Sequence, residues 1–148
     1  IVATDLKSGE SITFRRGNTG AAVRASSAVP AVFLPVRIGE REYVDGGLVA
    51  PVPVRQVREM GANFVIAVDI SSRPEDAKTS DMLKVLLQTF SIMGKSISQL
   101  ELAQADLVVR PALPDVGSAE FSARKKSIEA GRAAMKQALP QLKALMAR

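Results

Sequence analysis

The chain has 148 residues, of which 47% are hydrophobic, so it can form one domain with a buried core. It contains neither cysteine nor histidine, which excludes disulfides, a thiol nucleophile, the commonest zinc ligands and any Ser-His-Asp triad formed within these residues. If these residues take part in acyl transfer, the general base must be another group, and a carboxylate is the natural candidate.

The net charge of +5 permits attraction to phosphate groups or to an anionic membrane surface. The basic residues are nevertheless spread along the chain, and the densest cluster, Arg124 to Lys126, lies in a region predicted to be helical, where a solvated face explains it. Aromatic residues make up only 4% of the chain, so a base-stacking surface is not expected and we predict no nucleic-acid partner. The apolar stretches, such as Phe64 to Val68, are far shorter than the roughly 20 residues of a membrane-spanning helix.

The first residues predict a hairpin followed by a helix. Ile1 to Leu6 and Ser11 to Arg15 have extended patterns, and the polar stretch between them is typical of a tight turn. Asn18 can cap a helix over Thr19 to Ser26, because its side-chain oxygen can accept from the free N–H groups of the first turn. The opening residues have no Met or apolar leader before them, so we expect the chain to begin inside a domain.

The next segment predicts an irregular connection, a strand and a helix. Ala31 to Ile38 alternates poorly and contains a proline, which favours an irregular or edge segment. Arg41 to Val44 reads as a short strand that runs directly into Asp45-Gly46-Gly47, where the chain turns. Val54 to Met60 fits an amphipathic helix, and the glycine that follows is a plausible stop.

The second half predicts alternating strands and helices. Asn63 to Ile70 is a nearly unbroken apolar run, typical of a parallel strand covered on both faces. Helices are expected from Ser80 to Ala105 and from Ser122 to Met146, the second kinked or restarted at a proline, with a strand at Asp106 to Arg110 between them. Such alternation indicates an α/β fold with a mostly parallel sheet and helices on its faces.

Asp45 is the first candidate for a reactive group. In open parallel sheets the reactive groups collect beyond the carboxyl ends of strands, and Asp45 directly follows a short strand. The two glycines after it free the backbone for close approach, so the loop could aim the carboxylate into a cleft. An ordinary Asp-Gly turn between strands is the alternative interpretation, and on the dipeptide alone it is favoured.

Five short motifs change that balance. They are, in chain order, Ala3-Thr4-Asp5-Leu6, Ala25-Ser26-Ser27-Ala28-Val29-Pro30, Tyr43-Val44-Asp45-Gly46-Gly47, Pro51-Val52-Pro53-Val54 and Val65-Ile66-Ala67-Val68-Asp69. Each is weak by itself, but their order and spacing together resemble the patatin-like phospholipase family. Further along, Leu86 to Met93 is similar to the bacterial members related to neuropathy target esterase.

This resemblance implies a three-layer α/β/α fold of which residues 1–148 are the C-terminal part of a single domain. It implies a Ser-Asp dyad in which Asp45 accepts the serine proton, directly or through an ordered water, and returns it to the departing alcohol. Gly46 and Gly47 are expected to shape the Asp45 loop. Ser26 and Ser27 could line the site, and a structural role at a helix end is an equally open interpretation.

The nucleophile expected from the resemblance does not occur in the chain. Gly94-Lys95-Ser96-Ile97-Ser98 lacks the closing glycine of Gly-x-Ser-x-Gly and falls in a predicted helix rather than at a strand-to-helix elbow. The family's glycine-rich oxyanion loop is also absent, and in the family both precede the region matched here. One further departure is Ala50, where many relatives have asparagine. We therefore expect a serine esterase or lipid acyl hydrolase whose serine lies on an upstream segment; the alternative is an inert fragment with a structural or association role.

The remaining expectations concern neighbouring residues and partners. Asp5 and Asp69 follow predicted strands and are expected to cap turns rather than to catalyse. The apolar stripe from Met82 to Leu100 could border an acyl-binding groove, although core packing is the more conservative interpretation. No cofactor or metal is expected. The expected partners are a lipid or ester substrate, the upstream half of the domain and a membrane surface contacted peripherally. The expected location is the cytoplasm or the membrane periphery of a bacterium.

Overall fold

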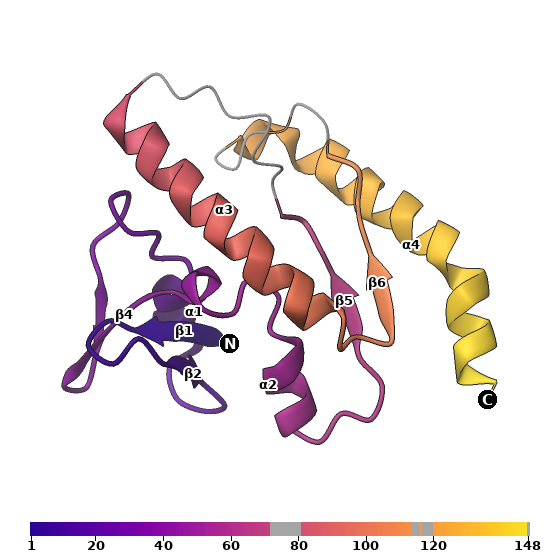
Figure 1. The fold of residues 1–148 in the computed structure, drawn as a ribbon, viewed down its shortest axis with the longest axis horizontal. Helices are drawn as coiled ribbons and strands as arrows, with labels where there is room; N and C mark the ends of the chain where they lie inside the picture. The colour runs from indigo at the N-terminus through magenta and orange to yellow at the C-terminus, as the bar shows by residue number, and fades with distance from the viewer. Residues whose placement is uncertain (72–80, 114–115, 117–119, 148) are drawn as a thin grey trace.

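The computed structural model describes residues 1–71, 81–113, 116 and 120–147. In these residues the chain is mixed α/β, with a four-stranded antiparallel sheet and a separate parallel pair of strands (Figure 1). The larger sheet has the order β2-β1-β4-β3. Its strands are β1 (Val2–Asp5), β2 (Ser11–Thr13), β3 (Val36–Ile38) and β4 (Arg41–Asp45).

The predicted hairpin and first helix are confirmed. β1 pairs with β2 in antiparallel register, with Ala3 opposite Ile12. Helix α1 (Thr19–Ser26) begins at the predicted cap, where Oδ1 of Asn18 accepts a hydrogen bond from the backbone N–H of Ala21 at 2.9 Å. Satisfying an otherwise unpaired donor of the first turn in this way fixes where the helix starts.

Helix α1 packs against one face of the four-stranded sheet. Alanines at this contact let the helix approach the strands closely, because their side chains add little bulk. The contact forms a hydrophobic cluster, at whose edge the rings of Phe14 and Tyr43 meet edge-to-face with centroids 5.1 Å apart. The buried members of the cluster are Ala3, Ala25, Ala28, Val36 and Tyr43.

A second core joins the later elements. The short 3₁₀ helix η1 (Gly46–Leu48) leads from β4 toward α2 (Val54–Glu59). The parallel pair consists of β5 (Ile66–Val68) and β6 (Leu107–Val109). This core is built from Val52, Val54, Val65, Ala67 and Leu102.

Two long helices complete the described structure. Helix α3 (Met82–Leu102) forms the crossover between β5 and β6, and its predicted start at Ser80 lies outside the described residues. A 3₁₀ turn, η3 (Phe121–Ala123), precedes α4 (Arg124–Met146), which continues through Pro140 as one helix, so no second helix begins there. None of the described helices combines the length and the apolar character that crossing a bilayer requires.

The prediction of a mostly parallel sheet is wrong for the described part of the chain. Three of its four strand pairings are antiparallel, and only β5 and β6 run parallel. For two of the three the reason is local: β1–β2 and β3–β4 are joined by short turns, and a short turn can only connect antiparallel neighbours. The long α3 crossover, by contrast, permits a parallel pair.

The predicted cover on both faces of β5 is also not found in the described residues. Val65 and Ala67 are buried against α2 and α3, but Ile66 and Val68 are 41% and 54% exposed. The apolar run therefore marks a strand, as predicted, but its length and hydrophobicity do not reveal which face a neighbour covers.

Candidate active site

Asp45 occupies the end of β4, at the place where the sheet stops and the chain turns into η1. Across the sheet it lies opposite Ala3 of β1. Its backbone N–H donates to the carbonyl oxygen of Ala28 at 3.0 Å. On this side of β4 the earlier residues pair with β3, and at Asp45 the segment that follows α1 replaces β3 as the partner. Its own carbonyl oxygen accepts a hydrogen bond from Oγ1 of Thr4 at 2.8 Å.

The Asp45 carboxylate is half-buried and held by one of its oxygens. Oδ1 accepts the backbone N–H of Gly47 at 2.7 Å, a short charge-assisted hydrogen bond. Burial raises the pKa of the Asp45 carboxyl above its ordinary value, and the Gly47 hydrogen bond offsets part of that increase. A carboxylate with a raised pKa is a stronger base than a free one, which suits a group that must remove a proton.

Both glycines after Asp45 lie in confined space, and the backbone around Gly46 leaves no room for a side chain. Gly46 is buried, and a Cβ atom there would collide with the carbonyl group of Val2. A Cβ atom at Gly47 would lie 3.0 Å from Oδ1 of Asp45, inside the space that the carboxylate occupies. The loop also lies against α3, because a Cβ atom on Gly94 would be 4.0 Å from the Gly47 carbonyl oxygen.

The two serines near this loop have different environments. Ser26 is half-buried at the last position of α1, whereas Ser27 is exposed and its hydroxyl donates to the carbonyl of Val23 at 2.9 Å. The Ser27 side chain therefore completes the end of the helix. Neither side chain is hydrogen-bonded to Asp45, and the connection runs instead through the backbone of Ala28.

Comparison with known proteins identifies a family for the part of the chain that contains the Asp45 loop. Residues 3–58, which contain all but the first residue of the four-stranded sheet, α1 and the Asp45 loop, match the family model described as patatin-like phospholipase. Residues 3–58 belong to a patatin-like phospholipase domain. The resemblance in the sequence is thereby confirmed, and the matched residues include the strand that ends at Asp45.

Relatives of this patatin-like chain occur in mycobacteria. An uncharacterized NTE family protein of Mycobacterium tuberculosis is 41% identical over 99 residues, which are 67% of this chain and 28% of the relative. Another uncharacterized NTE family protein, from Mycobacterium bovis, is 27% identical over 163 aligned positions, which cover 93% of this chain and 28% of that protein. The patatin-like chain thus spans little more than a quarter of the length of these relatives.

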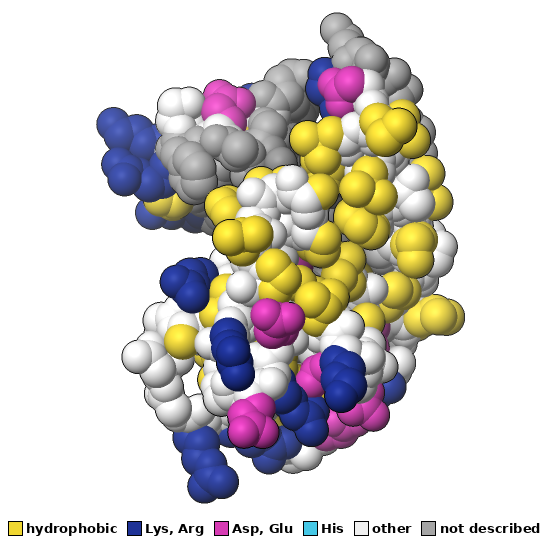
Figure 2. Space-filling model, turned by 90° about the vertical axis from the view of Figure 1, so that its left-hand side faces the viewer, with side chains coloured by type: hydrophobic (Ala, Val, Ile, Leu, Met, Phe, Trp, Pro, Cys, Tyr) yellow, Lys and Arg dark blue, Asp and Glu magenta, His cyan; other side chains and the backbone are white. Residues whose placement is uncertain are grey.

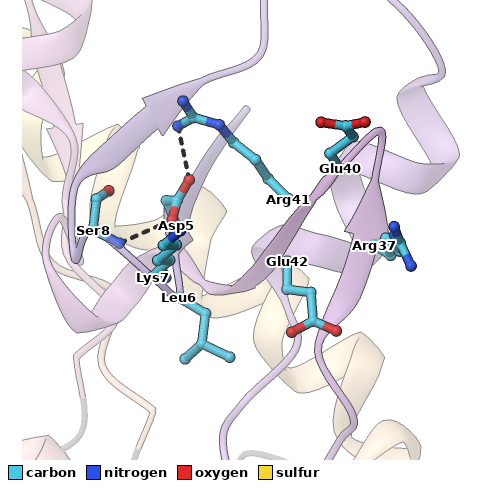
Figure 3. A pocket seen from close by; sticks show the side chains of 8 residues that line it. All are labelled: Asp5, Leu6, Lys7, Ser8, Arg37, Glu40, Arg41 and Glu42. Atoms are coloured by element: carbon cyan, nitrogen blue, oxygen red, sulfur yellow. Dashed lines mark hydrogen bonds and ion pairs between the residues drawn. The ribbon is translucent and has the colours of Figure 1, made fainter.

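Asp5 caps a turn in the patatin-like sheet, as predicted. It is the last residue of β1 and is 2% exposed, and its Oδ1 accepts the N–H groups of Lys7 and Ser8 at 2.9 and 3.0 Å. Figure 3 shows its other oxygen meeting Arg41 from β4, at 2.9 Å, within a pocket between the two hairpins. The Ser8 N–H and the Arg41 guanidinium hold the pKa of Asp5 below its ordinary value in spite of its burial.

This lowered pKa predicts an acid-dependent loss of stability. A carboxyl whose pKa is lower in the folded state stabilises the protein at pH values above its unfolded-state pKa, which is about 3.9. This stabilisation is lost as the pH falls through the folded-state pKa. Asp5→Asn should therefore lower the Tm clearly at pH 7, and the difference from wild type should shrink as the pH is lowered toward about 2. Thermal unfolding followed by circular dichroism across this range would measure it. An equal loss of Tm at both pH values would contradict the electrostatic explanation.

Asp69 likewise caps the end of its strand. Burial raises the pKa of Asp69, but hydrogen bonds from Ser71 and the ion pair with Arg110, at 3.2 Å, outweigh it and leave the pKa lowered. Of the three aspartates that follow strands and were predicted from sequence, only Asp45 has a raised pKa. Within the described residues, no group of three or more acidic side chains lies close enough to hold a metal ion.

Sequence analysis missed two buried polar residues, of which Thr4 contacts the site and Glu101 joins α3 to α2. Thr4 is 4% exposed, and its hydroxyl donates to the Asp45 carbonyl. Glu101 of α3 is 6% exposed and accepts the backbone N–H of Arg55, in the first turn of α2, at 2.9 Å. A polar residue within an otherwise apolar strand or helix face is the signal that could have identified both, because a buried polar group needs a partner.

Proposed function

We propose that this chain supplies the aspartate of a Ser-Asp dyad in a serine esterase or lipid acyl hydrolase. The observation that carries the proposal is the state of the Asp45 carboxylate, which has a raised pKa and is held through Oδ1 alone. Among the described residues Oδ2 has no hydrogen-bond partner. A base that is oriented by one oxygen and open at the other is suited to accept a proton.

In the proposed reaction, a serine from a Gly-x-Ser-x-Gly segment outside these 148 residues attacks the carbonyl carbon of an ester. Asp45 accepts the hydroxyl proton, directly or through an ordered water, as the Oγ–C bond forms. The proton then passes to the alkoxide as the C–O bond of the ester breaks. The alcohol departs, and the serine remains acylated as an acyl-enzyme. Asp45 next takes a proton from the attacking water and returns it to the serine when the acid is released.

The same proposal extends the fold beyond the described residues to a three-layer α/β/α domain, with residues 1–148 as its C-terminal part. Support comes from an open apolar surface that runs along α3 in the upper part of Figure 2. A surface of this size on one helix is suited to packing against the rest of the domain or to bordering an acyl chain. Its most exposed large side chains are Met82, Val85, Ile92, Met93 and Leu100.

The alternative is that this chain has a structural or association role without catalysis. The observation that favours it is the absence of Gly-x-Ser-x-Gly from the sequence, together with the position of Gly94 to Ser98 inside α3 rather than at an elbow. A chain without the nucleophile cannot form an acyl-enzyme, whatever the state of Asp45.

Labelling with a fluorophosphonate would separate the two. The full-length protein should react at a single serine and hydrolyse a p-nitrophenyl ester, whereas the 148-residue chain alone should do neither. Intact-mass measurement confirms which species carries the label. Absence of both labelling and hydrolysis in the folded full-length protein would refute the hydrolase proposal and favour the structural role.

A further inference from the structure

Asp45 is fixed at three points, and one of them is a side chain that sequence analysis did not select. Its N–H donates to Ala28, its Oδ1 accepts from Gly47, and its carbonyl accepts from the Thr4 hydroxyl. The first two partners are backbone groups, which every residue type provides. Thr4 is therefore the one side chain among the described residues that holds the Asp45 backbone by a hydrogen bond.

The position of Thr4 makes this contact difficult to replace. Thr4 lies in β1, next to β4, opposite Val44, and is 4% exposed, so water does not readily reach its hydroxyl. The Asp45 carbonyl marks the junction between β4 and the glycine loop, where the backbone leaves the sheet. The Asp45 carbonyl is partly buried, so after losing its donor it would turn toward another one, and the two glycines that follow give the chain freedom to turn.

We infer that Thr4 is a positioning residue for the proposed reaction: its hydroxyl fixes the Asp45 carbonyl and thereby the direction of the carboxylate. This inference rests on the proposed function of Asp45. Displacing a catalytic group by about 1 Å can cost on the order of 100-fold in rate, because the proton transfer requires a specific geometry. Thr4 itself needs no contact with the substrate.

The test compares Thr4→Val with Thr4→Ser in the full-length protein. Valine keeps the shape of the side chain but removes the hydroxyl, whereas serine keeps the hydroxyl. We expect Thr4→Val to lower kcat by roughly 10- to 100-fold with KM nearly unchanged, and Thr4→Ser to restore most of it. Thr13→Val is the matched control, because Thr13 is a threonine of the same sheet on the edge strand β2.

The pH profile supplies a readout that a purely structural role would not change. If the Asp45 loop turns away, the Gly47 hydrogen bond that lowers the Asp45 pKa weakens while burial remains. The acidic limb of the kcat/KM profile should therefore move to higher pH in Thr4→Val and return in Thr4→Ser.

Three outcomes would overturn the inference. If Asp45→Asn is inactive but folded Thr4→Val retains full activity, the dyad proposal stands and the positioning role is wrong. If Thr4→Val and Thr4→Ser lose activity equally, in proportion to a loss of folded protein, the threonine is only structural. If Asp45→Asn is fully active, the proposed function fails, and the role inferred for Thr4 fails with it.

Discussion

Asp45→Asn in the full-length protein should abolish ester hydrolysis without unfolding the protein. We expect kcat to fall by roughly 100- to 10,000-fold, the range usual for removal of a general base. Asparagine retains an oxygen that can accept the Gly47 N–H, so the loop should keep its shape while the group that takes the proton is lost. Initial rates with a p-nitrophenyl ester would measure the effect.

The stability of the same variant provides an internal control. The pKa of Asp45 is raised in the folded state, so folding disfavours the ionised carboxylate. The contribution of Asp45 to the free energy of unfolding therefore declines as the pH rises from the unfolded-state pKa through the folded-state pKa. Asp45→Asn should therefore be no less stable than wild type at pH 7. Asp69→Asn, which breaks the ion pair with Arg110, should instead lower stability and leave the rate per folded molecule unchanged. Substantial hydrolysis by folded Asp45→Asn would rule out the dyad.

Gly46→Ala should be among the most destabilising single methyl additions in the described structure. The new Cβ atom would overlap the backbone carbonyl of Val2, and backbone atoms at the centre of a sheet cannot move aside as a flexible side chain can. We expect a loss of about 1 to 3 kcal/mol in the free energy of unfolding, as for other overpacked positions. Urea denaturation would measure this loss, and activity should fall as well because Gly46 directly follows Asp45.

Gly131→Ala is the matched control and should raise the free energy of unfolding, the opposite of the effect expected for Gly46→Ala. Gly131 lies within α4, and a Cβ atom there would have nothing within 4 Å. Replacing a helical glycine by alanine at such a position stabilises by about 0.4 to 1 kcal/mol, chiefly by restricting the unfolded chain. If Gly46→Ala were as well tolerated as Gly131→Ala, the close approach of β1 to the loop would be incorrect.

Local chemistry made much of the fold predictable. Asn18 has one clear use, to cap the helix that follows it, and the structure places it there. The polar turn before Ser11 separates two extended runs, and a hairpin results. Pairing between distant strands could not be derived in the same way. Nothing in residues 41–45 shows that β4 pairs with β1 rather than with a later strand, because both choices satisfy the same pattern of apolar residues.

The candidate site was predictable only where it is continuous in sequence. Asp45, Gly46 and Gly47 are adjacent, so a strand followed by an acid and two glycines indicated them directly. Thr4 and Ala28 reach Asp45 from other elements, and their contribution depends on the register of β1 and on the end of α1. Ser27 was selected for its neighbours in sequence, but its hydroxyl is occupied by the carbonyl of Val23, a contact that only the folded helix defines.

The separate pair of parallel strands has a consequence for how this chain behaves in solution. Among the described residues β5 and β6 pair only with each other, so each presents an unpaired edge of backbone donors and acceptors. Open edges bind further strands readily, and the exposed Ile66 and Val68 would strengthen such contacts between molecules. In a longer polypeptide the same edges could be joined by neighbouring strands. In isolation they favour association between chains, so aggregation is expected to rise with protein concentration.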